Sequence, residues 1–355
     1  MSEPQPTQPQ SLLSIVAHCD NFSVSEEKIT PGGEKLVSWR LTPDLSSPVL
    51  GLLRPCVVDQ LKLESSNVWN FSLSGTSESI SFASSLDTPA KRTRVMKEMC
   101  ERWRDTGLWP DQIGPKKWRA EMYPIFRNPF GKRDAPLAED GEVETGDDST
   151  NYAFMMERAA CALVGVVTYG VHMTVYEGGP EGEFIGNGDE LQGYRIWVPK
   201  RARTKQTWPG YLDNSVAGGI PSGLGIFESV VKEAMEEASI PEYIVRKHAK
   251  ATGVISYFYR TDAGWLQPEV EYVYRLRVPP HVPLQLKPSD EEVESFELLE
   301  LPEVESRIRA GLFKPNCAVV LIDFMINHGL ITPDNEPDFL EIVTRIHGRF
   351  DYDRW

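Results

Sequence analysis

From residue 152 onward the sequence alternates between short apolar runs and segments with helical spacing. The strand-like runs cover residues 171–176, 194–199, 253–260 and 270–278. The helical segments cover residues 155–163, 227–238, 302–310 and 317–328. Such alternation predicts helices packed on a mixed sheet, so we expect an α/β domain over residues 152–355.

The first third of the chain has a different pattern. Residues 12–130 mix strand-like runs such as 35–41 with one clear helix, which starts after Thr88 and Pro89. This mixture predicts a small α+β domain. We expect the polar residues 1–11 to be disordered, and the acidic stretch 131–151 to be a linker or surface insertion.

Composition narrows the range of partners. A formal net charge of −15 disfavours coating a nucleic acid, because phosphate backbones are held by basic surfaces. The five cysteines are scattered without any CxxC pair, which favours neither a disulfide framework nor a zinc knuckle. No signal peptide or spanning segment is recognisable, so we expect a soluble cytoplasmic protein without nucleic-acid or membrane partners. The oligomeric state is left open.

The segment 227–238 combines a buried face with an acidic one. Its apolar stripe is formed by Phe227, Val230, Val231, Ala234 and Ala238. Glu233 reaches Glu236 at i+3 and Glu237 at i+4, so three carboxylates crowd one region beside the stripe. A divalent cation would convert this repulsion into coordination. Taken alone, the pattern is more typical of a solvated acidic helix face.

The residues before this helix favour the metal site. Residues 216–223 supply a strand end, the paired Gly218 and Gly219, and a turn. A glycine turn that leads into a helix lets the backbone approach a phosphate closely.

Gly218 and residues 232–240 together resemble the Nudix box, Gly-x5-Glu-x7-Arg-Glu-U-x-Glu-Glu-x-Gly-U, where U is aliphatic. The resemblance implies a Nudix α/β/α sandwich with a mixed sheet, preceded here by the small α+β domain. It also implies that Mg²⁺ or Mn²⁺ binds through Glu233, Glu236 and Glu237.

Three box positions depart from the family pattern. Leu224 stands at the loop glutamate, Lys232 at the arginine and Ser239 at the last glycine. In the family the loop glutamate and the arginine are expected to brace each other, and we expect Glu228 to pair with Lys232 instead. Ser239 in a left-handed helix cap would cost about 1 kcal/mol relative to glycine.

Other stretches resemble a narrower branch, the fungal and plant Nudix proteins associated with thiamine pyrophosphokinase. They are residues 158–160, 169–173, 200–213, 292–296 and 313–317. We expect no kinase domain here. The resemblance implies hydrolysis of a damaged thiamine diphosphate, such as oxo- or oxythiamine diphosphate, to the monophosphate and phosphate. The alternatives are an oxidised nucleotide (8-oxo-dGTP-like), a nucleotide sugar, or a diphosphate-binding module without turnover.

Roles within the site follow from this chemistry. We expect Glu233 and Glu237 to be metal ligands, and Glu236 to be a ligand or the base that orients the attacking water. Glu294, with Glu292 in a loop after the later strands, is a second candidate base, and a solvated acidic run is the alternative.

Substrate binding is assigned to residues that lie before and within the glycine turn. Lys200, Arg201, Arg203 and Lys205, with Gly218 and Gly219, are expected to hold phosphate oxygens, and an ordinary basic loop is the alternative.

Other residues have structural interpretations. Trp208 fits a packing anchor better than a stacking platform, and His172 fits a hydrogen-bonded core histidine. Asn316 is a natural N-cap for the last large helix. We expect the N-terminal domain to cover the substrate pocket.

Overall fold

The computed structural model describes residues 8–350 except 24–28, 30–31, 74–77, 137–148 and 180–192. Most of the expected disordered N-terminus and of the expected acidic insertion therefore lies outside the described residues. Among the described helices, none combines the length and the apolar character needed to cross a membrane.

The described helices are α1 (Leu12–Cys19), α2 (Pro55–Leu61), α3 (Pro89–Asp105), α4 (Cys161–Val164), α5 (Ile226–Ala238), α6 (Glu242–His248), α7 (Leu301–Arg309), α8 (Pro315–Asn327) and α9 (Phe339–Ile346), with the short 3₁₀ helix η1 (Arg158–Ala160). The described strands are β1 (Val37–Arg40), β2 (Val49–Leu53), β3 (Trp69–Ser72), β4 (Ser79–Phe82), β5 (Met122–Phe126), β6 (Tyr152–Glu157), β7 (Thr168–Gly178), β8 (Tyr194–Arg201), β9 (Val216–Gly219), β10 (Ala249–Arg260), β11 (Leu266–Arg277) and β12 (Val293–Glu300).

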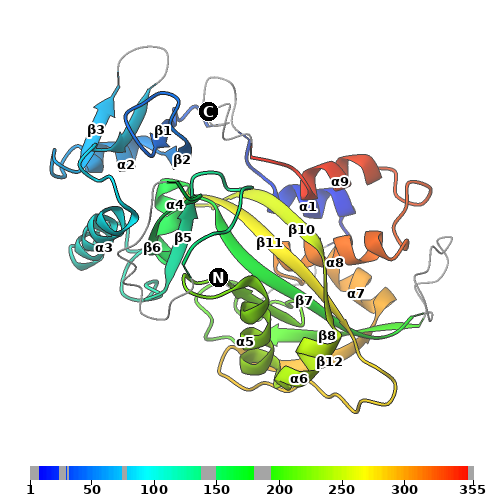
Figure 1. Cartoon of the computed structure of the whole chain (residues 1–355). Coiled ribbons are helices and arrows are strands. Elements are labelled where there is room, and N and C mark those ends of the chain that lie inside the picture. The colour runs from blue at the N-terminus through cyan, green and yellow to red at the C-terminus, as the bar shows by residue number, and fades with distance from the viewer. Residues whose placement is uncertain are drawn as a thin grey trace.

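The central sheet is mixed, as the alternating pattern predicts. Its described strands run in the order β10-β11-β7-β8-β12, and β9 pairs with β7. β11 and β7 are parallel, whereas the other neighbours are antiparallel. Helices α5 and α6 lie on one side of this sheet, and α1, α8 and α9 lie on the other (Figure 1). The predicted α/β/α sandwich with a mixed sheet is therefore confirmed.

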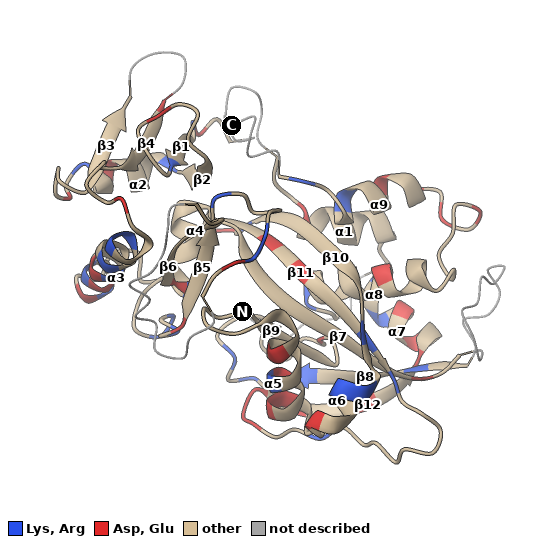
Figure 2. Ribbon diagram, viewed as in Figure 1, with Lys and Arg blue, Asp and Glu red and all other residues tan. Residues whose placement is uncertain are grey.

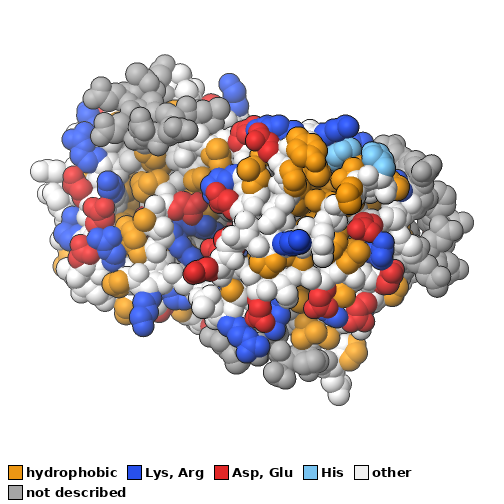
Figure 3. Space-filling model, turned by 90° about the horizontal axis from the view of Figure 1, so that it is seen from below, with side chains coloured by type: hydrophobic (Ala, Val, Ile, Leu, Met, Phe, Trp, Pro, Cys, Tyr) orange, Lys and Arg blue, Asp and Glu red, His pale blue; other side chains and the backbone are white. Residues whose placement is uncertain are grey.

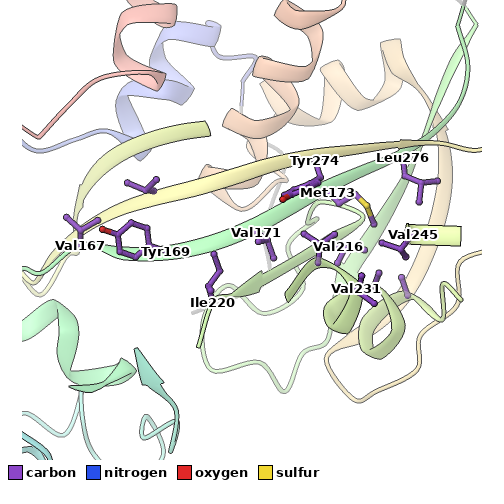
Figure 4. Close-up of a cluster of buried hydrophobic side chains, with 14 of the residues drawn as sticks. Val167, Tyr169, Val171, Met173, Val216, Ile220, Val231, Val245, Tyr274 and Leu276 are labelled. Atoms are coloured by element: carbon purple, nitrogen blue, oxygen red, sulfur yellow. The ribbon is translucent and has the colours of Figure 1, made fainter. Parts of the chain in front are cut away.

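Residue alternation along β7 explains how the sheet holds two layers of helices. Tyr169, Val171 and Met173 point into the hydrophobic cluster beneath α5, where they meet Val216 and Val231 (Figure 4). The residues between them point to the other face, because side chains alternate along a strand. This second face packs against α8, so each layer of helices has its own core.

The N-terminal region forms a sheet in the order β2-β1-β4-β3, flanked by α2 and α3. The helix predicted after Thr88 is confirmed as α3, and the Thr88 side chain caps it by accepting a hydrogen bond from the Lys91 amide. Contacts also cross the expected domain limits. β5 pairs with β6, and α1 packs on α8 and α9. The limits 12–130 and 152–355 stay a prediction.

The helix predicted for residues 155–163 is wrong. β6 occupies 152–157, and only residues 158–164 are helical, ending at Gly165 with φ 60°. Every residue of β6 is buried. A short apolar run buried on all sides shows no clear period, and its pairing with β5 decides the conformation.

Candidate active site

Helix α5 presents its carboxylates beside the sheet. Val230, Val231, Ala234 and Ala238 are buried on one face of the helix, and acidic positions occupy much of the rest of it (Figure 2). The helix ends at Ser239 with φ 55° and ψ 30°, so the left-handed cap of the family pattern is kept without its glycine. The Ser239 hydroxyl donates to the Lys287 carbonyl at 3.0 Å, which offsets part of the strain.

Two of the three box glutamates turn toward β9. Glu237 accepts a hydrogen bond from the Ala217 amide at 3.1 Å, and Glu233 lies over Gly218. Burial, reinforced by Glu233 and Asp213, raises the pKa of Glu237 to about 8. Burial also raises the pKa of Glu233, against the opposing charge of Lys232. Two carboxylates that repel each other in a partly desolvated place are suited to a shared cation.

Gly218 is required for this arrangement. A Cβ added there would lie 2.3 Å from Cδ and 2.5 Å from Cγ of Glu233. We therefore expect Gly218→Ala to displace Glu233 and to weaken Mn²⁺ binding by about tenfold or more, as ligand displacement does elsewhere. Calorimetric titration of the metal-free chain measures the effect. Gly253→Ala is the control, because a Cβ on Gly253 meets nothing within 4 Å. Equal Mn²⁺ affinity in the two variants would contradict the prediction.

The expected substitute brace between Glu228 and Lys232 is wrong. Glu228 forms a bidentate pair with Arg246 at 2.9 and 2.6 Å. Lys232 instead pairs with Glu236 at 3.0 Å and with Glu233 at 3.3 Å. The lysine therefore sits on the box carboxylates themselves, and Glu236, whose side chain is 54% exposed, is the outermost of them.

The basic residues expected to hold phosphate are mostly engaged with acidic partners. Lys200 and Arg203 both contact Glu294, at 3.6 and 3.5 Å, and Lys205 pairs with Glu292. Glu294, the second candidate base, lies on β12 rather than in a loop. Lys205 also acts on Glu237, because its charge lowers the pKa of that carboxyl.

Arg201 has a structural environment. Its guanidinium pairs with the buried Asp213 at 2.5 Å and donates to the carbonyls of Trp208 and Thr207, each at 3.0 Å. These contacts use Nε, Nη1 and Nη2, so all three nitrogens bind the protein itself. Burial alone would raise the pKa of Asp213, but Arg201 and Lys314 hold it well below its usual range.

We expect Arg201→Ala to lower the free energy of unfolding by about 3–5 kcal/mol, because removing one partner leaves a buried charge uncompensated. Arg203→Ala, at a side chain that is 64% exposed, should change it by less than about 0.5 kcal/mol. Urea unfolding of both variants is the measurement. If both variants lost similarly little free energy of unfolding, the Arg201–Asp213 pair would contribute little to stability.

Further polar residues lie on the opposite face of the central sheet, the face that packs against α8. Glu271 on β11 is buried, and its Oε2 has no hydrogen-bond partner. A Cβ atom built on Gly170 would lie 2.2 Å from this Glu271 oxygen and 3.0 Å from the carbonyl oxygen of Gly218. The sequence analysis did not single out Glu271, and the strand gave no clear signal, because β11 also carries Glu269, Arg275 and Arg277.

Around Glu271, His172 is a buried core histidine, as expected. Its Nδ1 lies 2.6 Å from the Asn214 side-chain oxygen, and its Nε2 lies 3.6 Å from Glu271. Asn316 is not the N-cap of α8, because Lys314 holds that position. The Asn316 side chain instead donates to the Tyr257 hydroxyl at 2.9 Å, since burial against the sheet gives it a partner there.

The donor set fits a hard divalent cation in part. Among the described residues, His, Cys, Asp and Glu side chains nowhere form a group of three arranged to hold a metal ion. Mg²⁺ sites, however, use one or two carboxylates and take their remaining ligands from water and substrate phosphates. Glu233 and Glu237, which lie together against β9, offer oxygen ligands of that kind.

Fold and site together define an α/β/α protein with a loop–helix site of carboxylates. Residues 186–317 match the family model described as NUDIX domain. The chain therefore carries a Nudix domain.

Several proteins are similar to this chain. An uncharacterised protein of Saccharomyces cerevisiae is 42% identical over 251 residues, covering 67% of this chain and 64% of that protein. Nudix hydrolase 20, chloroplastic, of Arabidopsis thaliana is 34% identical over 266 residues, covering 74% and 60%. A solved MutT protein from Methanosarcina mazei is 14% identical, with a TM-score of 0.32, covering 44% and 92%. The chain spans less than two thirds of the length of the first two, so its activity, substrate and partners are proposals.

Proposed function

We propose that this protein is a divalent-metal-dependent hydrolase that cleaves the phosphoanhydride bond of a small diphosphate. The observation that carries the proposal is the placement of Glu233 and Glu237 against β9, in the register of the Nudix box. The family match and the named hydrolases among the relatives support it.

In this proposal Glu233 and Glu237 hold Mg²⁺ or Mn²⁺, and the exposed Glu236 is a further ligand or orients the attacking water. When bound, the cation neutralises charge on the diphosphate oxygens and lowers the pKa of a water. Water attacks one phosphorus atom, the bridging P–O bond breaks, and a monophosphate and phosphate leave. Glu294 remains a candidate base, although Lys200 and Arg203 engage it.

The basic side chains near the site have a second role in this proposal. Acidic and basic side chains are interspersed on the face seen from the side of α5 and α6 (Figure 3). Lys200, Arg203 and Lys205 exchange their carboxylate partners for phosphate oxygens when the substrate binds. Gly218 and Gly219 are not part of this contact, because Glu233 and Tyr123 fill the space over them.

For the substrate we propose a damaged thiamine diphosphate, on the strength of the resemblance to the thiamine pyrophosphokinase-associated branch. A panel of oxythiamine, oxothiamine and intact thiamine diphosphates, 8-oxo-dGTP and nucleotide sugars, assayed with Mn²⁺, tests it. We expect release of the monophosphate and the highest kcat/KM on the damaged thiamine compounds.

The panel also separates the alternatives. A nucleotide or nucleotide sugar as the best substrate would overturn the thiamine assignment and keep the hydrolase. Tight binding of diphosphates without any product would overturn the hydrolase itself. In that case Lys232, which occupies two of the box carboxylates, would be the first residue to examine.

A further inference from the structure

A segment from the N-terminal region, residues 117–123, runs along the rim of the box loop. At one end, the Lys117 ammonium donates a hydrogen bond to the carbonyl oxygen of Gln206 at 3.0 Å, directly after Lys205 in the chain. Further along, the amide of Ser222, which lies in the loop between β9 and α5, donates to the Met122 carbonyl at 2.8 Å. These two contacts fix the segment against the site from outside the part of the chain that matches the family model.

The second box glycine lies under this segment. A Cβ built on Gly219 would lie 1.5 Å from the Tyr123 hydroxyl and 3.3 Å from Cζ of Arg158. The Arg158 guanidinium lies over the Tyr123 ring at 5.1 Å and uses Nη1 to pair with Glu121 at 2.8 Å. Its side chain is nevertheless 41% exposed, so this guanidinium borders both the box glycine and solvent.

Arg119 is the second cation at this place. Its backbone amide is fixed by Glu157 at 3.0 Å, and the next residue, Ala120, has φ 55°. A left-handed alanine costs about 1 kcal/mol, and such strain persists where the surroundings enforce it, often at functional sites. Arg119 lies in the chain between Lys117 and Met122, the two residues that hold this segment against the box loop.

The two arginines repel each other in a partly desolvated place. Burial, followed by the charge of Arg158, lowers the pKa of Arg119, although Glu292 and Glu121 oppose this. No hydrogen bond joins the Arg119 guanidinium to the described part of the chain. Two neighbouring guanidinium groups, of which Arg158 uses Nη1 to pair with Glu121, are suited to a multiply charged anion.

We propose that Arg119 and Arg158 form an anion-binding pair that takes phosphate oxygens of the diphosphate substrate. The inference rests on the proposed function and adds to it a substrate-binding surface from two residues that precede the part of the chain matching the family model, Arg119 in the N-terminal region and Arg158 after β6.

Equilibrium binding of methylenediphosphonate, a diphosphate analogue whose bridge cannot be hydrolysed, tests the pair. Calorimetry on the full chain with Mg²⁺ compares the wild type with Arg119→Ala, Arg158→Ala and Lys116→Ala. Lys116 is the matched control, since it is an exposed cation close to Arg119 in the sequence. We expect each arginine variant to weaken binding about tenfold or more, and Lys116→Ala to stay within about twofold.

Kinetics give a second readout. On the best substrate of the panel, Arg119→Ala should raise KM about tenfold with kcat within about threefold, and Arg119→Lys should recover part of the loss, since its charge is kept and its bidentate geometry is not. Arg158→Ala also removes the pair with Glu121, so if it fails to fold, Arg119→Ala decides alone.

The outcomes separate this inference from the function beneath it. If the wild type binds and hydrolyses diphosphates while Arg119→Ala does both equally well, the anion-binding pair is wrong and the hydrolase stands. If the wild type neither binds the diphosphonate nor cleaves any member of the panel, the proposed function falls, and the pair with it.

Discussion

Glu237→Gln is expected to reduce kcat with Mn²⁺ by at least about a hundredfold while leaving the fold intact. Metal-based charge stabilisation contributes several kcal/mol to such reactions, and each 1.36 kcal/mol is tenfold in rate. The amide oxygen of glutamine can still accept the Ala217 hydrogen bond, so the position of α5 against β9 is preserved. Only the anionic ligand is lost.

Steady-state kinetics on the best substrate of the panel measures this effect, and circular dichroism checks the fold. Glu242→Gln is a suitable control. Glu242 lies in the first turn of the next helix and pairs with Arg246 at the surface, away from the box carboxylates. Undiminished turnover in Glu237→Gln would remove this residue from the metal site, whereas equal losses in both variants would point to a general effect on stability.

The metal-free protein is expected to lose stability as the pH rises from 5 to 8, and Glu237→Gln should remove much of that loss. Glu237 keeps its proton in the folded state up to about pH 8, whereas an unfolded glutamate ionises near pH 4.3. Between these values the folded state binds more protons, so unfolding becomes easier with rising pH. Glu233, whose pKa is also raised, acts in the same direction.

Urea unfolding in EDTA at pH 5 and pH 8 tests this linkage. At pH 8 the glutamine variant should exceed the wild type by on the order of 3 kcal/mol, and at pH 5 the two should nearly agree. Added Mn²⁺ should stabilise the wild type at pH 8, since the cation replaces the proton, and should have little effect on the variant. Parallel pH profiles of wild type and variant would show that the Glu237 carboxylate is not desolvated.

Several box features follow from local sequence, and the structure agrees with them. The spacing of Val230, Val231 and Ala234 places one face of α5 on the sheet, and the position of Gly218 leaves room for Glu233. Helical periodicity and the lack of a side chain are properties of a short segment, which is why they can be recognised without knowing the rest of the fold.

Other features depend on partners distant in sequence. Arg201 looked like a phosphate-binding residue within a basic run, yet Asp213 and two backbone carbonyls surround it. Glu228 has a suitable helical neighbour in Lys232. It pairs instead with Arg246 on the following helix, which donates two hydrogen bonds to its carboxylate. Which charged side chains pair depends on the distance between them in the folded chain. Helical spacing gives that distance only for residues on the same helix.

The sequence by itself determined the alternating sheet-and-helix pattern and the register of the carboxylates on α5, because both rest on interactions within a few residues. Only the tertiary structure decided that residues 152–157 form a strand, and that Tyr123 and Arg158 meet Gly219. The physical reason is the same in both cases. A buried apolar run or a solvent-facing cation is compatible with several local conformations, and long-range packing selects one of them.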